Sequence, residues 1–405
     1  MKKRLIAILV LVLAFVSFAQ KPYVLLVSFD GFRWDYLNRN ITPNLENFYK
    51  EGVRALTLQP VFPSKTFPNH ISIITGMYPE NHGIITNKFE NTYTHEYYKL
   101  SDREEVRNAK WYLGEPFWVT AKRNGIRTAS FYWPSSSVSD SSKAPDIYKL
   151  YDGSVPYNSR VDTVVSWLQM PYKKRPHFIT LYFSETDTYG HKYGPNSSEI
   201  NKAIKDLDNV SGYLFSSLKK IGMYDSVNVI ILSDHGMTEI FKDKIINVQK
   251  KYLSNYNVKY SNAGPLMMIE PQKNQLKEVY NILKKNEFHF KVYKKKDVPE
   301  YLHFSKNPFI YSLVLVADLG WSLVDNSTYE MFAGNKNDNK GNHGYDNHLL
   351  DMHAIFIARG PAFKNGYVTG TLRNIDIYPL MCKIFGINPD HKIDGKLERI
   401  EFILK

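Results

Sequence analysis

Six side chains that commonly bind metal ions stand in four short motifs of this sequence. They are Asp30, Asp187 with His191 four residues later, the adjacent Asp234 and His235, and His343 in a glycine-flanked loop. A spacing of four places Asp187 and His191 on one turn of a helix, where both can reach one ion. Imidazole nitrogens with carboxylate oxygens, and no thiolate, suit zinc and tolerate other divalent ions. Each motif is common by itself in a chain with 12 histidines, so the prediction depends on all four meeting.

Thr66 is a candidate nucleophile at the start of the apolar segment 70–74. Pro68 suits the first turn of a helix, where its missing N–H is not needed. Thr66 should therefore lie at a helix N-terminus, where free amides favour negative charge. A lone threonine there more simply caps the helix. A hydroxyl needs a metal or a base to attack at neutral pH, and the chain offers metal ligands but no obvious base.

Buried strands and amphipathic helices alternate along the chain. Continuous apolar runs are typical of strands covered on both faces, as in parallel sheets, and they occupy Tyr23–Phe29, His177–Phe183, Val227–Leu232 and Ala354–Ile357. Helical patterns lie between them at 44–51, 116–124, 160–168 and 200–221. This alternation predicts an α/β sandwich.

The acidic motif residues follow three of these predicted strands. Asp30 and Asp234 come directly after apolar runs, and Asp187 comes a few residues after a third. Ligands of open α/β sheets bind at the carboxyl ends of strands. We therefore expect the three carboxylates to face one cleft.

The N-terminal segment predicts export. Residues 1–19 combine three basic residues, an apolar run and small residues before Ala19, which is typical of a cleaved secretory signal. The apolar run is short of the roughly 20 residues that span a bilayer, so no stable transmembrane anchor is expected. We predict a periplasmic or secreted protein, most simply from a bacterium.

The remainder, 20–405, is predicted to be one catalytic domain with a small insert at approximately 240–335. Strand patterns at 266–270, 290–294 and 311–317, with a helix at 275–285, predict a βαββ-type insert. A single cysteine, Cys382, excludes an internal disulfide framework. Removing the signal lowers the formal charge from +12 to +9, which favours anionic substrates or an anionic membrane face. The lysines are dispersed, so no binding of a nucleic acid duplex is expected, and the oligomeric state is left open.

Taken together, the motifs resemble the nucleotide pyrophosphatase/phosphodiesterase family of the alkaline phosphatase superfamily. The resemblance covers nearly the whole mature chain, including SFDGFRWDYL (28–37), PSKTFPNH (63–70), YPENHGIITN (78–87), ETDTYGHKYGP (185–195), SDHGM (233–237) and GNHGYDN (341–347). It implies an alkaline-phosphatase-like α/β/α sandwich with a mostly parallel central sheet and two zinc ions per chain. By motif, Asp187, His191 and His343 would hold one ion, and Asp30, Asp234 and His235 the other.

The resemblance also implies roles for residues around the metals. Thr66 would be the nucleophile that forms a threonyl-phosphate intermediate, and Asn87 would bind a phosphate oxygen together with the Phe67 amide. An aromatic pair, Phe67 and Tyr151, would sandwich a nucleotide base, with Trp133 in the pocket wall. The expected activity is hydrolysis of nucleoside triphosphates, dinucleotides or other phosphodiesters to nucleoside 5′-monophosphates. The nucleophile segment has no arginine for a dianionic monoester, which favours diesters.

Three alternatives remain at this point. A choline phosphodiesterase of the same family would need an aromatic and acidic cage, for which the tyrosine-rich segment 93–98 is available. Ser137 stands where an acidic residue is expected in nucleotide-selective members, which leaves base selectivity open. A sulfatase would need a cysteine or serine in place of Thr66. A non-catalytic zinc-binding surface protein would be expected to have lost a ligand or the nucleophile.

Overall fold

Strand β1 (Tyr23–Phe29) lies at the centre of the fold, and its alternating side chains build both halves of the core. The computed structural model describes residues 21–334, 339–389 and 392–405, so the predicted signal at 1–19 lies outside the described residues. All seven residues of β1 are buried. Leu25 and Val27 pack into one hydrophobic cluster, and Val24 and Leu26 into another. A strand alternates its side chains between two faces, so this sheet must be covered on both sides.

The central sheet has eight strands, and all but one run in the same direction. Its order is β18 (Tyr367–Arg373), β2 (Val53–Gln59), β17 (Phe356–Arg359), β8 (Val227–Leu232), β1, β7 (Phe178–Phe183), β5 (Thr128–Phe131) and β6 (Ile147–Lys149). Strand β17 is antiparallel to both neighbours. The expectation of a parallel strand at Ala354–Ile357 is therefore wrong in direction, because an apolar run indicates burial on both faces and says nothing of polarity.

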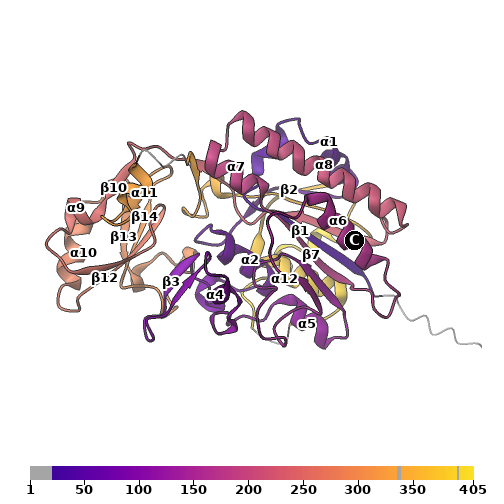
Figure 1. Ribbon diagram of the computed structural model, residues 1–405, viewed down its shortest axis with the longest axis horizontal. Helices are drawn as coiled ribbons and strands as arrows, with labels where there is room; N and C mark the ends of the chain where they lie inside the picture. Colours follow the sequence, from indigo (N-terminus) through magenta and orange to yellow (C-terminus); the bar gives the residue numbers. More distant parts are fainter. Residues whose placement is uncertain (1–20, 335–338, 390–391) are drawn as a thin grey trace, which may run out of the picture.

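Helices cover the two faces of this sheet, as Figure 1 shows. The helices packed into the first cluster are α1 (Pro43–Lys50), α6 (Tyr157–Leu168) and α8 (Ser198–Lys220). Those packed into the second are α2 (Thr66–Thr75), α5 (Phe117–Arg123) and α12 (Ile377–Phe385). The predicted α/β/α sandwich and its four predicted helices are confirmed.

A separate lobe, here called the accessory lobe (residues 245–333), lies to one side of the main body (Figure 1). Its antiparallel sheet has the order β11 (Val258–Ser261), β12 (Leu266–Pro271), β14 (Leu313–Ala317) and β13 (Phe290–Lys294). Around the sheet lie β10 (Ile245–Asn247), α9 (Val248–Tyr252), α10 (Leu276–Lys285), β15 (Ser322–Val324) and α11 (Tyr329–Ala333). The three predicted strands and the helix are present, and β11 was not predicted. The boundaries of an insert as a folding unit stay a prediction.

Short elements connect the lobe and complete the chain. Strand β9 (Thr238–Glu239) pairs with β16 (Gly341–Asn342) where the chain leaves for the lobe and returns from it. The other short helices and strands are α3 (Pro79–His82), β3 (Lys88–Glu90), β4 (Tyr97–Lys99), α4 (Arg103–Arg107) and α7 (Glu185–Tyr193). The 3-10 turns are Trp34–Asn38, Ala109–Trp111, Lys295–Asp297, Glu300–Leu302, Leu350–Met352, Asn374–Asp376, Leu397–Arg399 and Glu401–Ile403. Within the described ranges, no helix has the length and apolarity needed to cross a bilayer.

The N-terminus of α1 is capped by a side chain from α8. Thr42, at the cap position, makes no side-chain capping bond. Instead the buried Asp208 carboxylate accepts hydrogen bonds from the Leu45 amide (2.8 Å) and from the Asn44 amide (3.2 Å) and side chain (2.8 Å). This carboxylate therefore joins the two helices.

We expect Asp208→Ala to lower the free energy of unfolding by about 1–3 kcal/mol, because it leaves buried amides without an acceptor. Chemical denaturation followed by circular dichroism measures this change. Asp206→Ala on the same helix is the control, since Asp206 forms only a surface pair with Lys202 and its loss should leave the unfolding free energy nearly unchanged. Equal stability of the two variants would contradict the capping role.

Candidate metal centre and nucleophile

The ends of three adjacent strands bring the acidic residues together. Strands β7, β1 and β8 are neighbours in the sheet, and Asp30 and Asp234 follow β1 and β8 directly. Gly31 has a φ of +68°, and a Cβ there would lie 2.8 Å from the Cα of Asp187. Its amide donates a hydrogen bond to Oδ1 of Asp234 (3.2 Å). The glycine allows α7 to approach β1 closely enough to bring Asp187 to the other carboxylates.

Asp187, His191 and His343 form the first group. Asp187 and His191 lie one turn apart on α7, as their spacing predicts. Oδ1 of Asp187 lies 3.4 Å from Nε2 of His191 and 3.4 Å from Nε2 of His343. The two Nε2 atoms are 3.1 Å apart. All three ligand atoms lie within 4.8 Å of one another.

Asp30, Asp234 and His235 form the second group. Nε2 of His235 lies 3.3 Å from Oδ1 of Asp30 and 3.1 Å from Oδ2 of Asp234. After His235 the chain needs glycine because a Cβ on Gly236 would lie 2.1 Å from the carbonyl oxygen of Asp351. Glycine is required at 236 because of this close approach. Its backbone conformation does not require glycine, since φ is not in the left-handed region. The structure therefore brings all six predicted ligand residues close together. Among them, the donor atoms of Asp30, Asp187 and His235 also lie within 4.8 Å of one another, so the division into two groups stays a prediction.

Backbone carbonyls orient the three imidazoles. Nδ1 of His191 bonds to the carbonyl of Gly341 (2.9 Å), Nδ1 of His235 to that of Gly236 (2.8 Å), and Nδ1 of His343 to that of Ser64 (2.7 Å). A carbonyl can only accept, so each Nδ1 carries the proton. In the neutral ring each Nε2 then presents a lone pair to the carboxylates. Metal-binding histidines are commonly oriented in this way.

Whether a metal ion fits this site can be judged from the carboxylate oxygens at its centre, which need a positively charged partner. Oδ1 of Asp30, Oδ1 of Asp187 and Oδ2 of Asp234 are buried without a hydrogen-bond donor among the described residues. Burial and the charges of Asp234 and Asp187 raise the pKa of Asp30 well above its usual range. Burial, with the nearby charges of His235 and Lys65, lowers the pKa of His343. Unpartnered carboxylate oxygens facing imidazole lone pairs fit divalent cations.

His70 and Trp133 are buried side chains next to the candidate ligands. Nδ1 of His70 lies 2.9 Å from the carbonyl of Thr66 and 3.3 Å from Oδ2 of Asp234, and Nε2 contacts the Ser28 hydroxyl at 2.8 Å. Both ring nitrogens thus have protein partners, and His70 also forms a set of donor atoms within 4.8 Å of one another with Asp30 and Asp234. The Trp133 indole donates to the His70 carbonyl (3.2 Å) and is only 2% exposed. The Trp133 ring packs edge-on against His70 (5.0 Å between centroids), and its place in the wall of a nucleotide pocket stays a prediction.

Thr66 is the first residue of α2 and faces the second group. Its Oγ1 lies 3.3 Å from Nε2 of His235. The Asn69 side chain fixes the preceding loop, because it accepts from the Val61 amide (2.7 Å) and donates to the Lys65 carbonyl (2.8 Å). The hydroxyl is therefore placed at a helix N-terminus beside the candidate ligand His235.

Asn87 and the Phe67 amide meet directly. The Phe67 N–H donates to Oδ1 of Asn87 at 3.1 Å. The Phe67 side chain is nearly buried, and its ring packs edge-on against Tyr98 with centroids 6.2 Å apart. The two predicted phosphate-binding groups therefore lie together at the start of α2.

Tyr151 reaches the metal centre through a residue that the sequence reasoning missed. Its ring is 45% exposed and packs edge-on against Tyr132 (5.2 Å) and Tyr182 (6.4 Å). The Tyr182 hydroxyl donates to Oδ2 of Asp30 at 2.5 Å. The signal for Tyr182 is its place in β7. It lies directly opposite Ser28 of β1, and Ser28 is two residues before Asp30.

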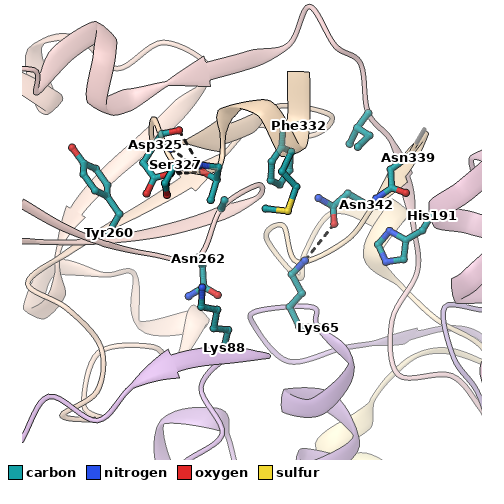
Figure 2. Close-up of a pocket in the computed structure, with 14 residues that line it drawn as sticks. Lys65, Lys88, His191, Tyr260, Asn262, Asp325, Ser327, Phe332, Asn339 and Asn342 are labelled. Atoms are coloured by element: carbon teal, nitrogen blue, oxygen red, sulfur yellow. Dashed lines mark hydrogen bonds between the residues drawn. The ribbon is translucent and has the colours of Figure 1, made fainter. Parts of the chain in front are cut away.

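Lys65 is the second missed residue. Figure 2 shows its ammonium directed at Asn342, with Nζ 3.3 Å from Oδ1. Its stem passes so close to Gly344 that a Cβ there would lie 2.3 Å from Cε of Lys65. Burial lowers the pKa of Lys65 to about 8, although Asp187 opposes the shift. The signal was its position next to Thr66.

We expect a divalent cation such as Zn²⁺ to raise the Tm of metal-depleted protein, because the cation offsets repulsion among the buried carboxylates. Cation at 100 times its Kd contributes about 2.7 kcal/mol of stability. Differential scanning fluorimetry of wild type and of His343→Ala measures the effect, which the variant should largely lose. His348→Ala is the control, since His348 is half exposed, pairs with Asp346, packs against Tyr301 and belongs to neither ligand group. A wild-type Tm unaffected by cations would contradict the metal centre.

Comparisons with known proteins identify the family of this chain. The family model for type I phosphodiesterase / nucleotide pyrophosphatase matches residues 24–346. Human ectonucleotide pyrophosphatase/phosphodiesterase family member 1 is 40% identical over 91% of this chain. Bis(5′-adenosyl)-triphosphatase enpp4 of Xenopus laevis is 39% identical over 90% of this chain and 78% of its own length. These relatives are animal proteins and give the expected bacterial source no support.

A solved structure shares the fold over almost the whole chain. Murine ectonucleotide pyrophosphatase/phosphodiesterase 5, solved as an inactive variant in complex with AMP, has a TM-score of 0.88 and 32% identity over 95% of this chain and 100% of that chain. The chain spans about 40% of the length of the human relative. From the family match over most of its length and the shared fold, the chain belongs to the type I phosphodiesterase / nucleotide pyrophosphatase family of the alkaline phosphatase superfamily.

Proposed function

We propose that the chain hydrolyses nucleoside triphosphates, dinucleotides and related phosphodiesters to nucleoside 5′-monophosphates. The observation that carries the proposal is Thr66 at the N-terminus of α2, with Oγ1 3.3 Å from Nε2 of His235. A hydroxyl in that place can attack phosphorus only if it is activated, and the adjacent ligand groups offer the means. The names of the relatives, one a bis(5′-adenosyl)-triphosphatase, support the same activity.

Two zinc ions fit the donor atoms best. Asp187, His191 and His343 would hold one ion, and Asp30, Asp234 and His235 the other, with nitrogen and oxygen donors throughout. When bound, such ions supply Lewis-acid chemistry, which favours the ionised hydroxyl and stabilises charge on the leaving oxygen.

The residues of the chain then account for a two-step displacement. Oγ1 of Thr66 loses its proton to solvent and forms a bond to phosphorus, and the bond to the leaving oxygen breaks, with its electron pair going to the leaving group. Water next attacks the same phosphorus and displaces Thr66, which regains its proton, and the nucleoside 5′-monophosphate departs. A phosphate oxygen would replace Oδ1 of Asn87 as the acceptor of the Phe67 N–H. The Asn87 side-chain amide can then rotate and donate its own N–H groups to the phosphate.

Aromatic residues near the centre support a nucleotide over a choline ester. Phe67 adjoins the nucleophile, and Tyr151 packs on Tyr182 beside Asp30. The AMP complex of the murine neighbour shows that a protein of this fold takes a nucleoside monophosphate. The tyrosines proposed for a choline cage are dispersed: Tyr93 and Tyr97 are exposed, whereas Tyr98 is buried. A quaternary cation needs several rings around it at once, so the choline alternative has less support.

Thr66→Ala should lower kcat by roughly 10⁴- to 10⁶-fold, as loss of a covalent nucleophile does in other hydrolases. Zinc content, measured by mass spectrometry, should stay near that of wild type because Thr66 belongs to neither ligand group. Acid quenching during turnover should trap a nucleoside 5′-monophosphate covalently bound to wild type but not to the variant. Thr163→Ala, on α6, is the control and should turn over normally. Wild-type kcat in Thr66→Ala would refute the nucleophile assignment.

We expect kcat/KM to be far higher for ATP and diadenosine triphosphate than for lysophosphatidylcholine, measured side by side. Tyr151→Ala should lower kcat/KM for both nucleotides by roughly 5- to 150-fold, the equivalent of about 1–3 kcal/mol for one base stacked on an aromatic ring. Tyr148→Ala, on the edge strand β6, is the matched control. A higher value for the lipid would reverse the substrate assignment.

A further inference from the structure

A cavity of about 370 Å³ separates the nucleophile loop from the accessory lobe. Figure 2 shows that Lys65 and Lys88 line it from the main body, whereas Tyr260, Asp325 and Phe332 line it from the lobe. Its volume lies in the range of about 300–1,000 Å³ that is typical of pockets for small organic ligands. The cavity belongs to neither ligand group, but it shares His191 with the first.

The end nearest Thr66 is positively charged. Lys65 precedes the nucleophile, and its ammonium is held against Asn342 by a contact of 3.3 Å. Lys88 is exposed and directly follows Asn87. Two ammonium groups beside the nucleophile favour phosphate groups that carry full negative charge.

The side of the cavity formed by the accessory lobe is aromatic and contains a carboxylate. Tyr260 on β11 and Phe332 on α11 provide rings, which can stack on a planar base. Oδ1 of Asp325 accepts bonds from the Thr328 amide (2.8 Å) and the Ser327 hydroxyl (2.9 Å). A fixed negative charge there repels a phosphate chain, so the anionic part of a ligand should end at the lysines.

The position of the cavity assigns it to the leaving group. Attack by Thr66 and departure of the leaving oxygen occur on opposite sides of phosphorus. The retained nucleotide is proposed to lie with Phe67 and Tyr151, and Tyr151 approaches Asp30 of the second group. The cavity adjoins His191 of the first group, whereas the ligand residue beside Thr66 is His235 of the second group.

From these observations we infer that the cavity is a leaving-group subsite for the second nucleotide of a dinucleoside polyphosphate. Lys65 and Lys88 bind its phosphates, and Tyr260 and Phe332 pack on its base. With diadenosine triphosphate, the bond from Oγ1 of Thr66 to the attacked phosphorus forms, the bridging bond breaks, and ADP leaves with the electron pair into this cavity. The inference rests on the proposed function. It adds a preference for leaving groups that carry a base, which pyrophosphate lacks.

The test compares three substrates that share AMP as the retained group. They release ADP (diadenosine triphosphate), pyrophosphate (ATP) and 4-nitrophenolate (the 4-nitrophenyl ester of AMP). Tyr260→Ala and Phe332→Ala should each lower kcat/KM for diadenosine triphosphate roughly 5-fold or more relative to the other two substrates. Phe288→Ala, an exposed aromatic of the same lobe outside the cavity, is the matched control and should keep the wild-type ratios.

A second pair of variants tests the charged end. Lys88→Met should lower kcat/KM for diadenosine triphosphate and ATP relative to the nitrophenyl ester, whose leaving group carries no phosphate. Lys99→Met, opposite Lys88 in the β3–β4 hairpin, is its control. Ratios that stay at wild-type values in Tyr260→Ala, Phe332→Ala and Lys88→Met, while all three substrates are hydrolysed, refute the subsite alone. Failure of wild type to hydrolyse any of the three refutes the proposed function, and the subsite with it.

Discussion

Repulsion among three carboxylates is the constraint on which the rest of the site depends. Asp30, Asp187 and Asp234 meet because β7, β1 and β8 are neighbours and end at the same edge of the sheet. Each has a buried oxygen without a donor among the described residues. Such a cluster is costly in a folded protein unless a cation neutralises it. The site is thus an arrangement in which the fold supplies the negative charge and a bound cation stabilises it.

The geometry around this charge is fixed by hydrogen bonds to the backbone. Ser64 lies two residues before Thr66 and makes two hydrogen bonds to the 343–345 loop. Its carbonyl accepts from the His343 ring, and its hydroxyl donates to the Tyr345 carbonyl (2.7 Å). The nucleophile loop and the His343 loop are therefore held as one unit. His343 is therefore tied to the loop that leads into α2, whose first residue is Thr66. This type of support is what makes a catalytic arrangement rigid before substrate binds.

Much of this arrangement could be predicted, because its signals are local. Apolar runs identify the strands, and the four-residue spacing of Asp187 and His191 places both on one helical turn. Contacts between distant segments leave no such signal. The antiparallel direction of β17 depends on its connections, and the burial of Trp133 depends on how α2 packs over the sheet. Lys65 and Tyr182 have ordinary sequence contexts and gain their roles only when the loop at 342–344 and β1 lie beside them.

The β9–β16 pair has a consequence for how this protein can diverge. The pair joins the two points at which the chain enters and leaves the accessory lobe. The two ends of the lobe are therefore held together, as in an inserted segment. None of the six ligands, nor Thr66, belongs to the lobe. Evolution can therefore lengthen, shorten or exchange this segment while the hydrolytic machinery keeps its shape, and a lineage can acquire new substrate preferences without rebuilding its chemistry.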